Sequence, residues 1–357
     1  MNLFKTSFFF LFLVILKTAS AQTHFQKLDA WLDQNTREMG GRSILVIYKD
    51  GKLVYNHSAN DMNMRQKMAA RYVARKQGKT ADMEEYSLST RLNIASCSKW
   101  YSAALVMTFV DEGKLKLSDT VGKFLPVLSQ HGKGGITISQ CLSHLTGIQA
   151  PELKENIKDV VDANSMDEVI ATIAKMPMEG EPGKTFHYSN TGLQIAGAVI
   201  EKISGKNFET LFAERIAAPL GMKNTDFGRK KVALPAGGAL STPEDYLNFL
   251  AMITNKGLFN NKRILSEAAI AQMQINRITP GVKIAYSPAE AKSLGYGYGE
   301  WTMGNNIVSS PGLFGSFPWV NNDKRYCGFL MTFYLKNTGR NERYFELMKL
   351  VDEAVGH

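Results

Sequence analysis

Strand-like runs occur only at the two ends of this 357-residue chain, and a long helical stretch separates them. Residues 43–48 and 52–56 flank an Asp-Gly turn, and three further runs follow at about 305–309, 315–320 and 328–335. Residues from about 97 to 290 instead show helical patterns with caps and glycine stops. This order predicts an α/β fold in which an antiparallel sheet is assembled from both ends of the chain, with a mostly helical insertion.

Amphipathic helices at 25–39 and 341–355 are expected to flank the sheet. We therefore assign residues 22–357 to one domain, with an α/β part at about 22–96 and 290–357 and a helical part at about 97–289. The stretch 98–112 is apolar on nearly all sides and ends at Gly113, which indicates a helix buried in the core. A composition of 44% hydrophobic and 21% charged residues is that of a globular protein with a sizeable core.

The first 21 residues have the pattern of a signal peptide. Lys5 precedes an apolar run from Phe8 to Leu16, and Ala19-Ser20-Ala21 offers small residues for cleavage. An apolar run of nine residues is short for a membrane anchor, the alternative, which needs about 20. We therefore expect residues 1–21 to be removed and the protein to be exported, to the periplasm or beyond.

A basic segment, Arg65 to Lys79, carries much of the positive charge, which falls from +9 to +7 without Lys5 and Lys17. We expect an inserted helix at about 62–77, followed by a strand at 88–94. The segment could contact an anionic envelope surface, and a solvated basic helix is the alternative. Nucleic acid is not expected as a partner, because no binding motif accompanies the charge.

The remaining composition gives no sign of a cofactor. Three cysteines, Cys97, Cys141 and Cys327, cannot all pair within one chain and are expected to be buried thiols. The six histidines show no ligand spacing, so we expect no metal, and His144 is assigned a structural role. The absence of G-x-S-x-G argues against a nucleophile elbow.

The main candidate for chemistry is the S-x-x-K motif Ser96-Cys97-Ser98-Lys99, at the predicted junction between strand and helix. Residues three apart in a helix share a face, so the Ser96 and Lys99 side chains can meet. Free N–H groups at the helix N-terminus could stabilise an oxyanion on the substrate. Desolvation would lower the pKa of Lys99 and let its amine take the serine proton. A capping serine followed by a surface lysine is the alternative.

A second candidate, Tyr188-Ser189-Asn190, precedes a helix that begins near Leu193. The Tyr188 phenol could relay protons, and the Asn190 amide could hold a substrate carbonyl or the lysine. A similar triplet at 246–248 lies in a predicted helix, where residues two apart diverge, so we exclude it.

A third candidate is the glycine-containing run from Ser309 to Gly315. Gly312 would let a substrate backbone approach closely, and the Leu313 N–H could donate to an oxyanion together with that of Ser96. A plain turn is the alternative.

Together these motifs resemble the serine β-lactamase and D-alanyl-D-alanine peptidase superfamily, nearest to its class C and family VIII esterase branch. The resemblance covers nearly all of the chain after residue 21. It implies Ser96 as nucleophile, Lys99 and Tyr188 as the acid and base, Asn190 in substrate binding and Leu313 as oxyanion donor. The other segments that carry it are Gly113-Lys114-Leu115-Lys116-Leu117, Leu142-Ser143-His144-Leu145-Thr146-Gly147-Ile148 and Gly237-Gly238-Ala239-Leu240-Ser241-Thr242-Pro243.

The chain departs from that superfamily at Ser310-Pro311-Gly312, where Lys-Thr-Gly or His-x-Gly is common. Ser310 can offer a substrate only a neutral hydrogen bond, whereas a cation there would pair with a carboxylate. We therefore expect a serine hydrolase, esterase-like or peptidase-like, that cleaves an uncharged ester or amide of a small molecule or peptide, unless an arginine elsewhere supplies the charge. A slowly acylating, penicillin-binding or sensor module is the alternative. The sequence gives no signal for oligomeric state.

Overall fold

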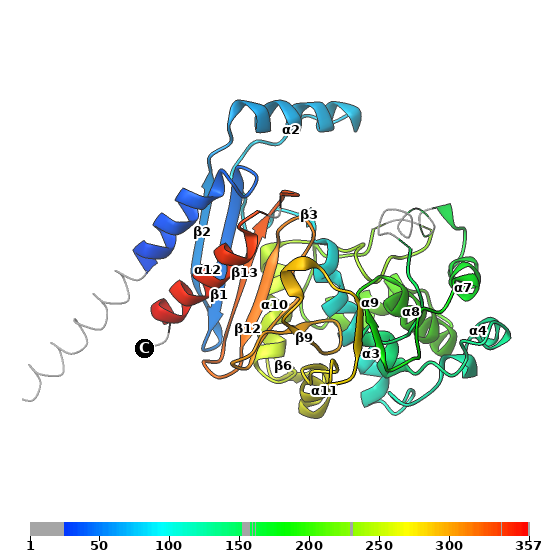
Figure 1. The fold of residues 1–357 in the computed structure, drawn as a ribbon. Coiled ribbons are helices and arrows are strands. Elements are labelled where there is room, and N and C mark those ends of the chain that lie inside the picture. Colours follow the sequence, from blue (N-terminus) through cyan, green and yellow to red (C-terminus); the bar gives the residue numbers. More distant parts are fainter. Residues whose placement is uncertain are drawn as a thin grey trace, which may run out of the picture.

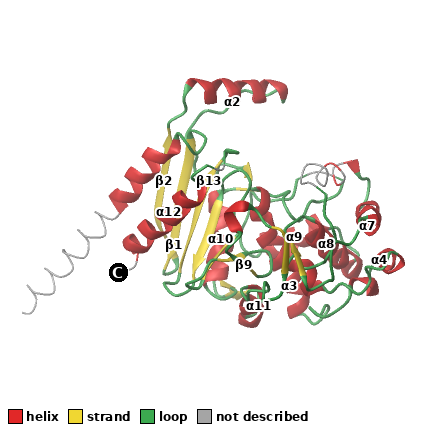
Figure 2. Cartoon of the chain, in the orientation of Figure 1, coloured by secondary structure: helices red, strands yellow, loops and turns green. Residues whose placement is uncertain are grey.

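The computed structural model describes residues 25–355, apart from 152–157, 159, 161, 229–230 and 337. The predicted signal peptide therefore lies outside the described residues. Within them the chain forms one large antiparallel sheet beside a group of helices (Figures 1 and 2). No helix in these ranges is long and apolar enough to span a bilayer.

The sheet joins the two ends of the chain, as the order of the strand-like runs predicts. Its seven strands follow the order β2-β1-β13-β12-β11-β10-β9. Val46 of β1 lies opposite Phe329 of β13, so a strand near the start pairs with one near the end. The strands are β1 (Arg42–Lys49), β2 (Lys52–Asn60), β9 (Gly295–Tyr296), β10 (Trp301–Thr302), β11 (Ile307–Ser309), β12 (Phe317–Asn321) and β13 (Tyr326–Thr332).

Both faces of the sheet are covered, because alternate side chains of each strand point to opposite sides. On β1, Leu45 and Ile47 pack in a cluster with the helix at 25–36 and with α12 (Arg340–Val355). Ile44 and Val46 belong to a larger cluster on the other face, together with the inserted helices. In Figure 1 the helix at 25–36 and α12 accordingly lie on the side of the sheet away from α3 (Ser98–Asp111).

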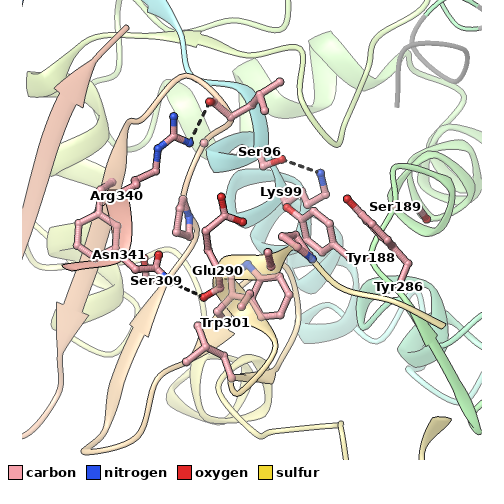
Figure 3. Close-up of a pocket in the computed structure, with 18 of the residues that line it drawn as sticks. Ser96, Lys99, Tyr188, Ser189, Tyr286, Glu290, Trp301, Ser309, Arg340 and Asn341 are labelled. Atoms are coloured by element: carbon pink, nitrogen blue, oxygen red, sulfur yellow. Dashed lines mark hydrogen bonds between the residues drawn. The ribbon is translucent and has the colours of Figure 1, made fainter. Parts of the chain in front are cut away.

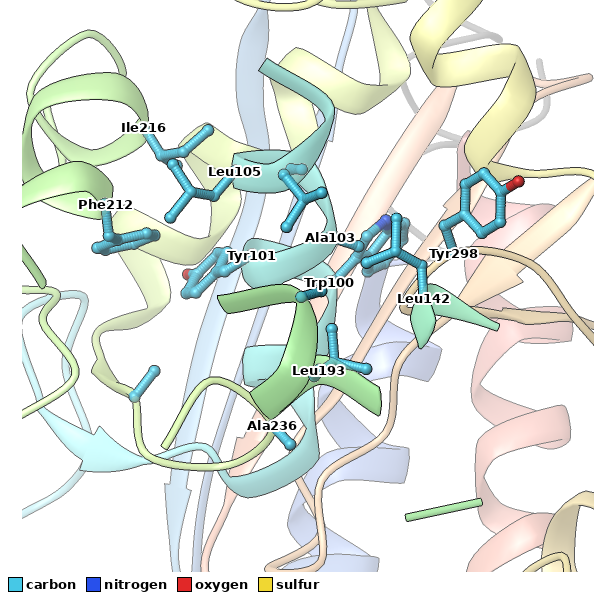
Figure 4. Packing of buried hydrophobic residues seen from close by; sticks show 14 of the residues in the cluster. Trp100, Tyr101, Ala103, Leu105, Leu142, Leu193, Phe212, Ile216, Ala236 and Tyr298 are labelled. Atoms are coloured by element: carbon cyan, nitrogen blue, oxygen red, sulfur yellow. The ribbon is translucent and has the colours of Figure 1, made fainter. Parts of the chain in front are cut away.

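Helix α3 runs through the helical part, and its residues from Ser98 to Phe109 are all buried. Figure 4 shows Trp100, Tyr101 and Leu105 of α3 packed among side chains such as Leu193 and Phe212. The other helices of this part are α4 (Pro126–Gln130), α5 (Ile138–Leu142), α7 (Met166–Lys175), α8 (Thr191–Ser204), α9 (Phe208–Phe212), α10 (Pro243–Thr254) and α11 (Glu267–Met273).

Short elements connect these helices. Single turns of other helix types are η1 (Ala95–Cys97), η2 (Val121–Lys123), η3 (Ala213–Ala217) and η4 (Ala289–Ala291). Three strand pairs lie outside the large sheet: β3 (Leu92–Asn93) with β5 (Leu240–Ser241), β4 (Thr185–His187) with β8 (Lys283–Tyr286), and β6 (Leu258–Phe259) with β7 (Lys262–Arg263).

The basic segment forms α2 (Met64–Lys76), which projects from the edge of the sheet (Figure 1). Asn63 and Gln66 form a capping box at its N-terminus. None of its residues is buried. The helix therefore gains little from packing against its own protein.

One local expectation needs correction. The strand predicted at 88–94 is reduced to the two residues of β3, because Ser87 and Thr90 close a turn in which the Thr90 N–H donates to the Ser87 carbonyl. At the start of α7 the Ser165 side chain accepts from the Glu168 N–H, and the Glu168 carboxylate accepts from the Asn164 N–H.

Candidate active site

Ser96 lies in η1, the single turn that leads from β3 into α3. The preceding residue, Ala95, has φ of 47°, a left-handed conformation that costs an L-residue about 1–2 kcal/mol. The Asn93 side chain accepts a hydrogen bond of 2.8 Å from the Ala95 N–H and holds this turn. Such backbone strain at the turn that leads into a buried helix is typical of a functional position.

Lys99 lies one turn further along and reaches Ser96. Its Nζ is 3.2 Å from Ser96 Oγ, 3.2 Å from Asn190 Oδ1 and 2.7 Å from the Ala236 carbonyl. The side chain is buried, and this desolvation lowers the Lys99 pKa to about 7. A substantial fraction of Lys99 is therefore neutral near pH 7.

The three hydrogen-bond partners of Lys99 determine which proton its neutral amine can accept. Two N–H bonds can remain on Asn190 and the Ala236 carbonyl, which leaves the lone pair for the Ser96 hydroxyl. The 3.2 Å contact then becomes a route for the serine proton to Lys99.

Tyr188, from the segment between β4 and α8, lies beside Ser96 and Lys99. Its ring centroid is 4.9 Å from Lys99 Nζ, and its hydroxyl lies near enough to the Ser96 side chain to affect the Tyr188 pKa. Burial raises the Tyr188 pKa above its usual range, and the Ser96 contact offsets part of that rise. Tyr188 is therefore a neutral phenol that can accept a proton from one neighbour while it donates its own to another.

His144 supports Tyr188 from beneath, as expected of a structural residue. The two rings lie 4.7 Å apart. The Ser189 N–H points to His144 Nδ1 at 3.5 Å, so Nε2 carries the proton and donates to the Tyr296 hydroxyl at 3.0 Å. Burial lowers the His144 pKa well below its usual value, which keeps the ring neutral.

Asn190 and Leu313 both line the cavity that also contains Ser96. The Asn190 oxygen accepts from Lys99, and no described residue accepts from its amide nitrogen. The Leu313 N–H likewise has no acceptor among the described residues. Both groups are thus free to donate to a bound carbonyl oxygen.

The structure places Ser310 differently from the substrate-binding role expected of it. Its buried hydroxyl points to the Ser96 carbonyl at 3.2 Å and to the Gly299 carbonyl at 3.0 Å, and it is not part of the cavity lining. Ser310 therefore ties the end of β11 to the turn that carries Ser96.

Gly312 is also explained differently. A Cβ at this position would lie 2.4 Å from the Ile94 carbonyl oxygen and 3.1 Å from Cys97 Sγ. The missing side chain thus makes room for the protein's own chain beneath Ser96, although Gly312 does line the cavity. Cys97 is a buried thiol whose pKa is raised by desolvation, so it fills space here.

The cavity in front of Ser96 has a volume of about 840 Å³. Figure 3 shows Arg340 and Glu290 on the side of it opposite Tyr188. The motif analysis did not find either residue, because both come from distant parts of the chain that meet only in the fold. The apolar side chains that line the cavity include Leu294, Trp301, Met303, Phe317, Tyr344 and Phe345.

Glu300 is a second feature that sequence reasoning missed. Its side chain is fully buried, and neither carboxylate oxygen has a hydrogen-bond partner. Burial raises its pKa well above the usual value, so the group is held as the neutral acid. Within the described ranges no group of His, Cys, Asp or Glu side chains could hold a metal ion.

Comparisons with known proteins agree on one family. A family model described as "Beta-lactamase" matches residues 28–353. Protein Rv1367c of Mycobacterium tuberculosis is 23% identical over 291 residues, which are 64% of this chain and 72% of that protein. Protein flp of Staphylococcus aureus is 26% identical over 208 residues, but the match covers only 38% of its length.

Two solved structures show the same fold. The octameric penicillin-binding protein homologue from Pyrococcus abyssi has a TM-score of 0.71 at 23% identity, covering 91% of this chain and 77% of the other. EstCE1, described as a hydrolase with promiscuous acyltransferase activity, has a TM-score of 0.72 at 18% identity, covering 94% of this chain and 99% of the other. The predicted α/β fold is thereby confirmed.

Proposed function

The chain belongs to the Beta-lactamase family, and from that premise we propose that it is a serine hydrolase that forms an acyl-enzyme on Ser96. The observation that carries this proposal is the 3.2 Å contact of Ser96 Oγ with Lys99 Nζ, which lies 4.9 Å from the Tyr188 ring centroid, at the edge of an 840 Å³ cavity. A nucleophile held beside a base, which is itself oriented by further groups, is the usual arrangement for covalent catalysis.

In the proposed first step Ser96 Oγ attacks the carbonyl carbon of an ester or amide, and its proton passes to neutral Lys99. The carbonyl oxygen becomes an oxyanion, which the N–H groups of Ser96 and Leu313 would stabilise. Its collapse breaks the bond to the leaving group, which takes a proton through Tyr188 from Lys99. The same groups then deprotonate a water that hydrolyses the acyl-enzyme and restores Ser96.

We favour esters and amides without a carboxylate next to the reacting carbonyl. The position where a cation would pair with such a carboxylate is occupied by Ser310, and its hydroxyl is engaged by two backbone carbonyls. The fold is shared with hydrolases of different substrates, including EstCE1 and a D-stereospecific amidohydrolase from Streptomyces. We therefore expect little β-lactam hydrolysis.

Labelling with a fluorophosphonate followed by mass spectrometry of the intact protein and its peptides tests this proposal. We expect one adduct per chain, on Ser96, and none with Ser96→Ala. Ser189→Ala is a matched control, because Ser189 lines the same cavity but its hydroxyl contacts only the Thr191 N–H, at 3.3 Å. Equal labelling of Ser96→Ala and the wild type would overturn the proposal.

Turnover of p-nitrophenyl butyrate separates an enzyme from a slowly acylating module. Repeated turnover is the expected result. A single burst of one p-nitrophenol per chain, with a stable adduct on Ser96, would instead favour the sensor alternative, since acylation would then proceed without deacylation.

A further inference from the structure

The cavity in front of Ser96 contains four side chains that can carry charge, and their pairing indicates what kind of substrate fits. They are Lys99, His187, Glu290 and Arg340. The His187 ring is bonded to the Glu179 carboxylate at 2.5 Å, so His187 already has a partner within the protein. Lys99 is partly neutral because its pKa is about 7. The net charge that the cavity presents to a substrate therefore depends on Arg340 and Glu290.

The Arg340 guanidinium is hydrogen-bonded to backbone carbonyls of the protein. One terminal nitrogen of the guanidinium donates to the Leu313 carbonyl at 3.2 Å, and the second donates to the Tyr334 and Lys336 carbonyls at 3.2 and 3.3 Å. The buried Nε has no hydrogen-bond partner among the described residues. The group also lies over the Tyr334 ring, 4.6 Å from its centroid. A substrate carboxylate could make the paired contact that arginine favours only by breaking these bonds. Arg340 thus positions the Leu313 loop.

Glu290 is held differently. Its backbone carbonyl accepts a hydrogen bond of 2.8 Å from Asn341 Nδ2, which ties η4 to the start of α12. Its side chain is half-buried and extends into the cavity, as Figure 3 shows. No described residue donates to this carboxylate. Of the four side chains named above, Glu290 is the one whose charged group makes no hydrogen bond or ion pair with another described residue.

Part of the cavity wall is apolar. Leu294, Trp301 and Phe317 line the same cavity as Glu290, so an apolar group of a ligand can pack there while a charged group reaches the carboxylate. A carboxylate beside apolar side chains attracts a cation and repels an anion more strongly than one in open water, because its charge is screened less.

We propose that the substrate carries a protonated amine on an apolar group, and that Glu290 binds this amine while Ser96 attacks the carbonyl. This inference rests on the proposed hydrolase function and specifies its substrate class. Esters and amides of hydrophobic amino acids with a free amine have this chemistry. Anionic substrates lack it.

Paired substrates that differ only in charge test the proposal. The first is phenylalanine p-nitrophenyl ester with a free amine, and the second is its N-acetyl form, each as both enantiomers. At pH 7.5 we expect kcat/KM for the free-amine ester to be at least tenfold higher than kcat/KM for its N-acetyl form, for one of the two enantiomers. Glu290→Gln should reduce that ratio to about one. Glu342→Gln, an exposed position on α12 outside the cavity, is the matched control.

A binding measurement keeps this inference separate from the hydrolase proposal. Calorimetry on the wild type should show 4-phenylbutylamine binding at least fivefold more tightly than 4-phenylbutyrate, with the preference lost in Glu290→Gln. If Ser96 is labelled but the amine has no advantage in turnover or binding, the Glu290 proposal is wrong and the hydrolase stands. If the amine binds through Glu290 but Ser96 is never acylated, the hydrolase proposal fails instead.

Helix α2 carries a second, independent proposal. Three of its apolar side chains, Met64, Met68 and Tyr72, are 67%, 63% and 61% exposed and recur every fourth residue on one face. Arg71 and Arg75 lie on the same face, and residues 62–81 contain six Lys or Arg and no Asp or Glu. A helix of 13 residues is only marginally stable alone, so an exposed apolar stripe of this kind favours a partner that covers it.

We propose that this face of α2 binds an anionic lipid surface. Methionine and tyrosine side chains can enter the boundary between head groups and acyl chains, while the neighbouring arginines extend to the phosphates. The charge favours this occupant over a second copy of the same helix, because two copies would repel.

Sedimentation with vesicles tests the lipid proposal. We expect binding to vesicles that contain 30% phosphatidylglycerol and at least tenfold weaker binding to pure phosphatidylcholine. Met68→Ser combined with Arg71→Glu and Arg75→Glu should abolish it, whereas Lys52→Glu with Lys262→Glu, two exposed lysines elsewhere, should retain most of it. Binding that ignores lipid charge would overturn the proposal, as would a dimer that dissociates in the triple variant without any vesicle binding.

Discussion

At the scale of single residues, Lys99 connects catalysis to pH. It is buried, it is bound to three oxygens, and its pKa is about 7. We expect acylation by p-nitrophenyl butyrate to rise about tenfold per pH unit below pH 6 and to level off above about pH 8, because the neutral amine is the base. Stopped-flow bursts from pH 5.5 to 9 measure this, and a rate independent of pH would contradict it.

The same pKa affects stability. The unfolded chain has an ordinary lysine with a pKa of about 10.5, so between pH 7 and 10.5 it binds more protons at this position than the folded chain does. The contribution of Lys99 to the free energy of unfolding therefore increases with pH across that window. Lys99→Met should remove this dependence, which urea unfolding at pH 7 and pH 9 can measure against the wild type.

Glu300 should have the opposite dependence. Its pKa is raised in the folded state, so the folded chain binds more protons above pH 4.5 and loses stability as the pH rises. Glu300→Gln keeps the shape of the neutral acid. At pH 8 we expect it to raise Tm by about 2–4 °C, which corresponds to roughly 1 kcal/mol. At pH 5 the two proteins should melt nearly together, and a lower Tm for the variant at both pH values would show that the acid has an unseen partner.

Contacts between residues close in the sequence were easier to predict than contacts between residues that are distant in the sequence. Ser96 and Lys99 are three apart, and that spacing alone brings their side chains to one face of a helical turn. Glu290 and Arg340 reach the cavity only through the packing of η4 against α12, which no local pattern contains. The contacts of the Ser310 hydroxyl with the Ser96 and Gly299 carbonyls could not be predicted, because its motif shows its neighbours in sequence and not the carbonyls that the fold brings to it.

At the scale of elements, the loop from β11 to β12 supports the turn that carries Ser96. Gly312→Ala would place its Cβ 2.4 Å from the Ile94 carbonyl oxygen, so the loop with Leu313 must move. We expect a loss of about 1–3 kcal/mol in stability and at least a tenfold loss in kcat. Gly135→Ala is the control, since nothing lies within 4 Å of its Cβ position. Unchanged kcat for Gly312→Ala would exclude Leu313 as an oxyanion donor.

Elements with capping signals were predicted closely, and those held by distant contacts were not. The expected helix 98–112 is observed as Ser98–Asp111, because a continuous apolar run and Gly113 define it locally. The strands β9 and β10 are only two residues long each and are fixed by pairing across the sheet. Their alternation is too short for a sequence pattern to identify.

At the scale of the whole molecule, one apolar cluster joins the sheet to the helices, which predicts a single unfolding transition. Phe329 of β13 is fully buried and stacks on Tyr246 of α10 with ring centroids 4.5 Å apart. We expect Phe329→Ala to cost about 3–5 kcal/mol. Tryptophan fluorescence and ester turnover should be lost at the same urea concentration in wild type and variant, and separate midpoints would show that the two parts unfold independently.

The pairing of β1 with β13 has a consequence for how the protein is made. Val46 cannot meet Phe329 until the more than 280 residues between them have been made, so the nascent chain lacks its central sheet while they are synthesised. During that time Leu45 and Ile47 have no partner strand on one side. The architecture therefore delays formation of the central sheet until β13 has been synthesised.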